Sequence, residues 1–89
     1  MQNSVEIIEE ALEVLEMPKF ITQKDLKKQY HFLARKYHPD LGGDAEKMEA
    51  LNNAYKLLTR YIEDFRYTFS EDEINKQFLG EGYAQRFKP

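Results

Sequence analysis

A sharp turn between two helical patterns is encoded by residues 33–44, which read LARKYHPDLGGD. Pro39 lacks a backbone N–H and disfavours the helical conformation at His38, so a helix entering this stretch is expected to end at about residue 37. Two glycines follow within the same turn, and Asp44 is a favourable N-cap for a new helix.

Apolar residues recur at helical spacing on both sides of this turn. The stripe before the turn contains Leu26, Tyr30, Leu33 and Tyr37, and the stripe after it contains Met48, Leu51, Tyr55, Leu58, Ile62 and Phe65. Two such stripes joined by a short turn are typical of antiparallel neighbouring helices. We therefore expect a helical hairpin over residues 22–37 and 44–62, with residues 38–43 at its exposed tip.

A further helix is expected before the hairpin, over residues 4–16. Its apolar face contains Val5, Ile8, Leu12 and Leu15, and Pro18 prevents its continuation. Thr22 and Asp25 have the spacing of a capping box, which marks the start of the next helix. The predicted fold is all-α, with the first helix packed across the base of the hairpin.

The segment after the hairpin has a different pattern. Three aromatic residues alternate with polar ones, at positions 65, 67 and 69. Ser70 and Glu73 again have capping-box spacing, so we expect an extended segment followed by a short helix over residues 71–79. Because aromatic residues normally pack, this segment is expected to cover the open side of the hairpin. Residues 80–89 are expected to fray.

The composition of the chain excludes several classes of function. The chain has 89 residues, enough for one domain, which we place at residues 1–79 with a distinct C-terminal segment over 63–79. It has no cysteine, which excludes disulfides, thiol catalysis and cysteine-based zinc sites. There is no glycine-rich phosphate loop, no membrane-length apolar run and no secretory signal, so we expect no cofactor, no membrane partner and a cytoplasmic location.

The net charge of −3 conceals a strongly uneven distribution of acidic and basic residues along the chain. Residues 1–16 contain five glutamates and no base, whereas residues 24–36 contain Lys24, Lys27, Lys28, Arg35 and Lys36 against one acid. The helical spacing places most of these bases on the outward side of the second helix, together with His31. A local basic patch on an acidic protein favours an acidic protein partner over nucleic acid.

The tripeptide His38-Pro39-Asp40 lies in the turn. Taken alone, it is most simply a helix stop followed by a turn. A catalytic His–Asp pair would need a nucleophile and a pocket that excludes water, and an exposed tip offers neither. His31 and His38 are seven residues apart, which is not the spacing of a zinc pair, so no metal is expected.

In its context, this tripeptide closely resembles the centre of the J domain, the module of DnaJ-type co-chaperones. The resemblance runs from about Glu10 to Leu58 and includes the stretches 12–15 (LEVL), 27–30 (KKQY), 38–40 (HPD) and 53–55 (NAY). The Gly-Gly turn is similar to that of J domains such as those of polyomavirus T antigens. The sequence lacks the Gly/Phe-rich linker and zinc repeats of full DnaJ-like proteins, and so resembles either a minimal J protein or the J portion of a longer chain.

The resemblance implies a regulator and not an enzyme. J domains dock on an ATP-bound DnaK-type 70-kDa heat-shock chaperone and stimulate its ATP hydrolysis, which assists protein folding. On this resemblance Asp40 pairs with an arginine of the chaperone, Pro39 fixes the loop, and His38 places the polar groups of the loop by hydrogen bonds. We expect the chain to act as a monomer.

The resemblance also assigns the basic helix to docking. Lys27 and Lys28, with Arg35 and Lys36, are expected to face an acidic surface of the chaperone, with His31 beside them. Tyr30 lies on the docking side in the family, while its spacing equally fits the packed stripe. The family commonly has bases where this chain has His31, Phe32 and Leu41, so we expect a weaker salt dependence of docking.

The sequence also admits two other classes of function. Residues 24–37 could serve as a DNA-recognition helix, but the net charge is negative and Leu26, Leu33 and Tyr37 are needed in the buried stripe. An exposed aromatic tail could instead form a homodimer or a scaffold contact. An elution volume that depends on concentration would indicate the latter, whereas retention on heparin or DNA would indicate the former.

Overall fold

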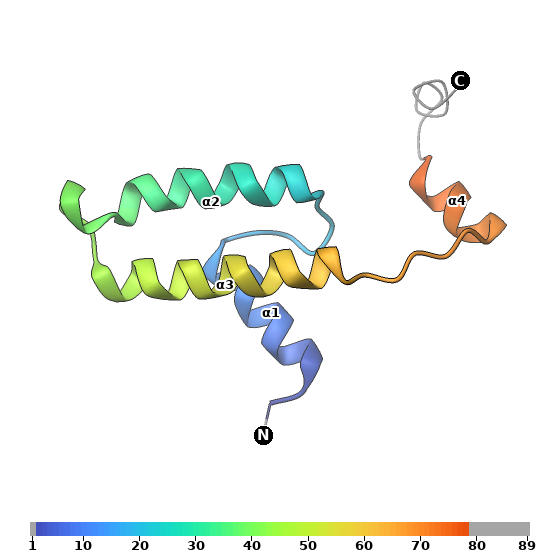
Figure 1. Ribbon diagram of the computed structural model, residues 1–89, viewed down its shortest axis with the longest axis horizontal. Helices are drawn as coiled ribbons and strands as arrows, with labels where there is room; N and C mark the ends of the chain where they lie inside the picture. The colour runs from blue at the N-terminus through green and yellow to red at the C-terminus, as the bar shows by residue number, and fades with distance from the viewer. Residues whose placement is uncertain (1, 79–89) are drawn as a thin grey trace.

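The computed structural model describes residues 2–78, which form four α-helices and one short 3₁₀ helix (Figure 1). These are α1 (Ser4–Val14), α2 (Gln23–Tyr37), η1 (Pro39–Leu41), α3 (Ala45–Glu63) and α4 (Glu71–Gln77). The predicted all-α class is confirmed. The predicted fraying of residues 80–89 and the last residue of the helix expected over 71–79 lie outside the described residues.

Helices α2 and α3 run antiparallel and form the predicted hairpin, with η1 at its tip (Figure 1). The capping box of α2 is complete, because Thr22 Oγ1 accepts from the Asp25 amide and the Asp25 carboxylate accepts from the Thr22 amide, each at 3.1 Å. Asp44 caps α3 by accepting from the amide of Glu46 at 2.9 Å. Both caps satisfy backbone donors that a helix leaves unpaired at its start.

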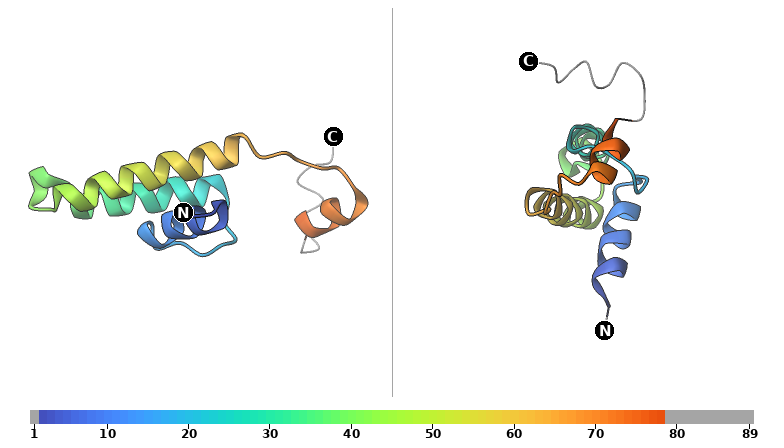
Figure 2. Two further views of the ribbon diagram at one scale, coloured as in Figure 1. Left: turned by 90° about the horizontal axis from the view of Figure 1, so that it is seen from below. Right: turned by 90° about the vertical axis from the view of Figure 1, so that its right-hand side faces the viewer.

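The core lies where the three longer helices meet. Its buried residues are Ala11, Leu15, Leu26, Leu33, Leu51, Ala54 and Leu58. The leucines come from the predicted stripes, whereas Ala11 and Ala54 allow α1 to approach α3 closely. Helix α1 crosses α3 beside the hairpin (Figure 2), and the Gln29 side-chain amide donates to the Leu15 carbonyl at 3.1 Å, which joins α2 to the end of α1.

Helix α1 ends at Val14, two residues before the predicted end, for a reason in its C-cap. Glu16 adopts the left-handed conformation with φ 53°, the amide of Met17 donates to the Leu12 carbonyl, and the amide of Glu16 donates to the Glu13 carbonyl. This is the Schellman arrangement, which is usually completed by glycine. The left-handed residue turns the chain out of the helix before Pro18 is reached.

The segment after α3, residues 65–78, is called the arm below. Its first part is extended, as predicted, and its helix α4 begins after Ser70. The prediction that its aromatics cover the hairpin is wrong, because Tyr67 is 71% exposed and Phe69 is 84% exposed. After the C-cap at Asp64 the extended chain continues away from the hairpin, and α4 stands apart from it (Figures 1 and 2).

The start of α4 contains only half of the predicted capping box. Ser70 Oγ accepts from the Glu73 amide at 3.3 Å, but the Glu73 carboxylate pairs with Lys76 at 3.3 Å. In residues 2–78 no helix has the length and apolar character needed to cross a membrane.

Candidate functional site

The turn at the tip of the hairpin is closed by its own backbone. His38 is extended (φ −62°, ψ 127°), as expected for a residue before proline, and ends α2 at the predicted position. The His38 carbonyl accepts hydrogen bonds from the amides of Leu41 and Gly43, each at 3.0 Å. A single carbonyl therefore anchors both the short helix η1 and the glycine that follows it.

The His38 side chain adds a second anchor. Its Nδ1 accepts from the backbone amide of Asp40 at 3.2 Å, and Asp40 Oδ2 lies 3.7 Å from the same nitrogen. Accepting this hydrogen bond uses the lone pair of Nδ1. The Asp40 backbone is held, while the Asp40 side chain is 88% exposed. The loop thus presents a carboxylate to solvent from a fixed backbone.

The two glycines have different steric roles. Gly42 is left-handed (φ 82°) with open space where a Cβ would lie. At Gly43, a Cβ would lie 2.2 Å from the carbonyl carbon of Tyr37. Only glycine permits this approach of the loop to the end of α2, so the loop shape depends on Gly43 more than on Gly42.

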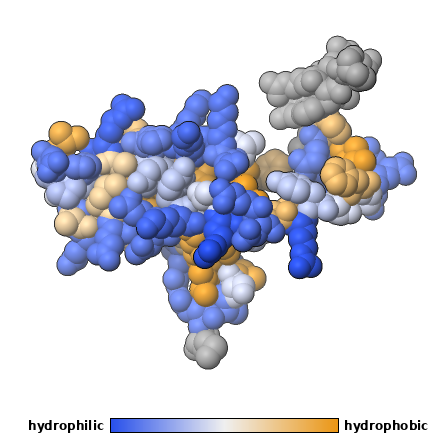
Figure 3. Space-filling view, viewed as in Figure 1, coloured by the Kyte–Doolittle hydropathy of each residue, from blue (hydrophilic) through white to orange (hydrophobic). Residues whose placement is uncertain are grey.

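The outward face of α2 carries the predicted basic residues. The four bases assigned to docking, and the histidine beside them, are all exposed: Lys27, Lys28, Arg35, Lys36 and His31. Within residues 2–78 no ion pair neutralises any of them, although Lys36 lies 5.4 Å from the centre of the Tyr37 ring. The upper edge of the molecule in Figure 3, along α2, is correspondingly hydrophilic. Arg35 and Lys36 are in the last turn of α2, directly before the loop.

Comparison with known families identifies this arrangement. The sequence model of the DnaJ domain family matches residues 10–67, which include α2, the loop and α3. The chain belongs to the DnaJ domain family. The resemblance to the J domain found in the sequence is confirmed.

Several curated proteins are similar to this DnaJ domain. A chaperone protein DnaJ of Finegoldia magna is 37% identical over 81% of the chain, which covers 20% of that protein. Chaperone protein dnaJ A6 of Oryza sativa is 51% identical over 53% of the chain, covering 11% of that protein. The chain thus spans a fifth or less of the length of these relatives. No solved structure matches the chain significantly.

Tyr30 of this DnaJ domain is half-buried between α2 and α3. Its ring stacks on Tyr55, with the ring centres 4.0 Å apart and the planes 9° apart. Its hydroxyl donates to Asn52 Oδ1 at 2.6 Å. Tyr30 therefore packs in the hairpin, as its spacing predicts, while one side of it stays accessible beside His31.

Two apolar residues lie on the elements that carry the charged site. Phe32 of α2 is 63% exposed and Leu41 of η1 is 71% exposed. Both side chains add exposed apolar surface to elements that otherwise carry charged side chains. Residues 2–78 contain no group of three or more side chains able to hold a metal ion.

Sequence reasoning did not find the two polar contacts that position α2. Asn52 fixes the Tyr30 hydroxyl, and Gln29 bonds to the Leu15 carbonyl. Both residues border the apolar stripes of their helices. This position is the only feature of the sequence that indicates a contact with a neighbouring helix. The hydrogen-bond partners of Asn52 and Gln29 cannot be predicted from the pattern of a single helix, because each bond joins two elements.

Proposed function

We propose that this DnaJ domain docks on the ATP-bound form of a DnaK-type 70-kDa heat-shock chaperone and stimulates its ATP hydrolysis. Asp40 forms a charge-assisted contact with an arginine of the chaperone, and the basic face of α2 lies against an acidic surface. The domain supplies no catalytic group and acts as a co-chaperone. A ligand changes the partner's state only by binding one state better, so docking must favour the hydrolysis-competent arrangement.

The observation that carries the proposal is the bond from the Asp40 amide to His38 Nδ1. It fixes the backbone of the exposed carboxylate, directly after the turn of α2 that carries Arg35 and Lys36. The Asp40 carboxylate and the basic side chains of Arg35 and Lys36 therefore lie at the same end of the hairpin. This pattern of charges complements a partner surface on which an arginine lies beside carboxylates. Preorganisation lowers the entropy lost on docking.

Equilibrium binding to a purified DnaK-type chaperone tests the proposal. We expect the native chain to bind the ATP-loaded chaperone at least tenfold more tightly than the ADP-loaded one. Asp40→Asn, which keeps the shape of the side chain and removes its charge, should abolish this preference. Asp72→Asn on α4 is the matched control and should bind like the native chain. Equal binding of the native chain in both nucleotide states would refute the proposal.

A further inference from the structure

Phe32 is an exposed aromatic residue in the middle of the basic face of α2. Its side chain belongs to a residue that is 63% exposed. On the surface of an α-helix, the neighbours of a residue are those three and four positions away along the chain. For Phe32 these positions include three of the exposed bases, namely Lys28, Arg35 and Lys36. The ring therefore lies among the bases that α2 presents to solvent.

Lys28, Phe32 and Lys36 follow one another at intervals of four residues, so they form one row along α2. The row spans about 12 Å at a rise of roughly 1.5 Å per residue. A partner surface that contacts both lysines at once must also cover the ring between them. Burial of Phe32 is thus a geometric consequence of docking through this face.

The fold itself leaves the Phe32 ring unused. Tyr30 and Tyr37 of the same helix pack against the core, whereas Phe32 belongs neither to the core nor to the residues packed on it. Among residues 2–78, no ring or ammonium group stacks on Phe32. Removing an apolar ring from water is favourable. The ring therefore retains a source of binding free energy that folding has not consumed.

An aromatic ring surrounded by charged side chains has the composition of a protein-docking surface. Such surfaces place a large apolar side chain at the centre, where a partner buries it, and polar side chains at the rim. Arg35 and Lys36 extend this rim to the last turn of α2, directly before the loop that carries Asp40. The apolar centre is therefore continuous with the site proposed to contact the chaperone.

We propose that Phe32 inserts into an apolar depression on the DnaK-type chaperone, and that this depression is bordered by the carboxylates that pair with the bases of α2. The inference rests on the function proposed above and specifies the chemistry of the partner surface. The chaperone is the occupant because the ring lies between bases that docking places against it. Phe32 is thus a specificity-determining residue: a chaperone with an acidic surface but without the depression binds this domain more weakly.

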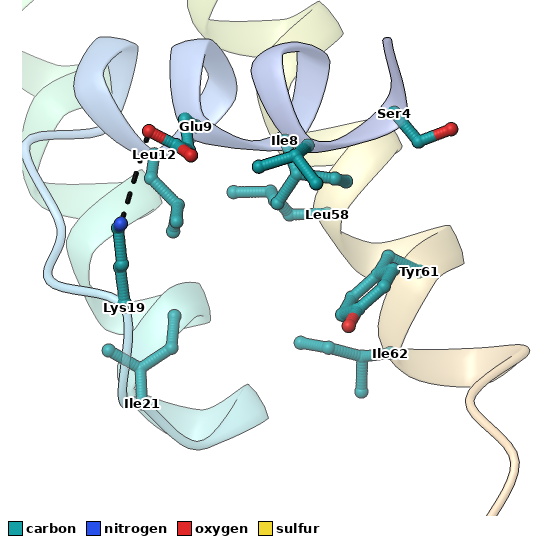
Figure 4. A pocket seen from close by; sticks show the side chains of 10 residues that line it. Ser4, Ile8, Glu9, Leu12, Lys19, Ile21, Leu58, Tyr61 and Ile62 are labelled. Carbon is teal, nitrogen blue, oxygen red and sulfur yellow. Dashed lines mark ion pairs between the residues drawn. The ribbon is translucent and has the colours of Figure 1, made fainter.

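Another exposed apolar surface lies at the opposite end of the hairpin and supplies a control. It is a groove of about 410 Å³ between α1 and the last turns of α3, with Ile8 and Ile62 in its lining (Figure 4). Val5 also lines it and is 63% exposed, the same fraction as Phe32. The loop with Asp40 precedes the first turn of α3, so docking there leaves the groove uncovered.

Equilibrium binding of the full 89-residue chain to the ATP-loaded chaperone, at low and at high salt, tests the proposal. Phe32→Ser should weaken binding about tenfold at both salt concentrations, because salt screens charges and does not weaken apolar burial. Phe32→Arg adds a base to a basic face and should nevertheless weaken binding. The controls are Val5→Ser in the groove and Phe69→Ser in the arm, where Phe69 is 84% exposed. Both should bind like the native chain, and all four variants should unfold at the native urea midpoint.

Two results would overturn the proposal at Phe32 itself. Phe32→Ser could bind like the native chain, or Phe32→Arg could bind more tightly, and the face would then recognise charge alone. An equal loss in either control would also overturn it, since the effect would then not belong to the basic face.

Asp40→Asn separates this proposal from the docking function on which it rests. If the native chain prefers the ATP-loaded chaperone, Asp40→Asn loses that preference and Phe32→Ser binds normally, then only the apolar depression is refuted. If the native chain binds both nucleotide states of the chaperone equally, the docking function is refuted and this inference with it.

Discussion

The hydroxyl of Tyr30 donates a 2.6 Å hydrogen bond to Asn52 Oδ1, and this bond joins α2 to α3. Tyr30→Phe removes the donor and keeps the ring that stacks on Tyr55. Since the half-buried Asn52 then loses a partner, we expect the free energy of unfolding to fall by about 1 kcal/mol in urea denaturation. Tyr61→Phe, at a half-exposed ring, is the control and should change it little. An unaltered midpoint for Tyr30→Phe would show that the bond adds nothing to stability.

Replacing each of the two loop glycines by alanine should have unequal effects on stability and on chaperone binding. Gly43→Ala places a Cβ 2.2 Å from the Tyr37 carbonyl carbon, so the loop backbone must move. Gly42→Ala meets open space and costs only its left-handed conformation, about 1 kcal/mol. We expect Gly43→Ala to lower the melting temperature more and to remove chaperone binding, whereas Gly42→Ala should retain binding. Equal effects of the two variants would contradict the steric role assigned to Gly43.

The hairpin and its tip were largely predictable from sequence because their determinants are local. Pro39 sets the end of α2, Thr22 and Asp25 form a cap within one turn, and the stripe through Leu26 and Leu33 identifies the buried face. Each of these depends on residues within a few positions of one another. The role of His38 came from the family resemblance, and the bond to the Asp40 amide agrees with it.

The remaining features depend on contacts between distant elements. Ala54 lies in the core because α1 crosses α3 at that point, which its own helix does not reveal. Glu16 adopts a left-handed conformation that glycine usually adopts at the end of a helix. Because a glutamate does not indicate a helix end, the end of α1 at Val14 could not be predicted from the sequence. The alternating aromatics of the arm predicted an extended chain correctly, but alternation does not determine what covers it.

Charge reversal on α2 should weaken docking in a salt-dependent way. Lys27 is exposed and forms no ion pair within the described residues. We expect Lys27→Glu to reduce affinity for the ATP-bound chaperone about tenfold at low salt, with a smaller effect at high salt. Lys56→Glu, the same reversal on α3, is the control. Equal losses for both variants would point to net charge and not to a docking face.

The Asp25 cap makes part of the stability depend on pH. Hydrogen bonds from the Thr22 amide and hydroxyl, with Lys28 and Lys24 nearby, lower the pKa of Asp25 below its usual 3.8. A lowered pKa in the folded state contributes stability above the ordinary value, and this is lost as the pH falls through the folded value. Urea denaturation should therefore show Asp25→Ala less stable than the native chain at neutral pH, with the gap closing in strong acid. A gap that stays constant into strong acid would contradict the role of the ionised cap.

In the function that we propose, a loop held by His38 presents Asp40 to a DnaK-type chaperone. The most direct measurement is single-turnover ATP hydrolysis by that chaperone with the native chain, His38→Gln, Asp40→Asn and Asp72→Asn titrated in turn. We predict that the native chain and Asp72→Asn raise the hydrolysis rate at least tenfold, and that His38→Gln and Asp40→Asn lose this effect while remaining folded. Stimulation that survives Asp40→Asn, or a native chain that stimulates no chaperone responsive to other DnaJ domains, would show that Asp40 does not carry this function.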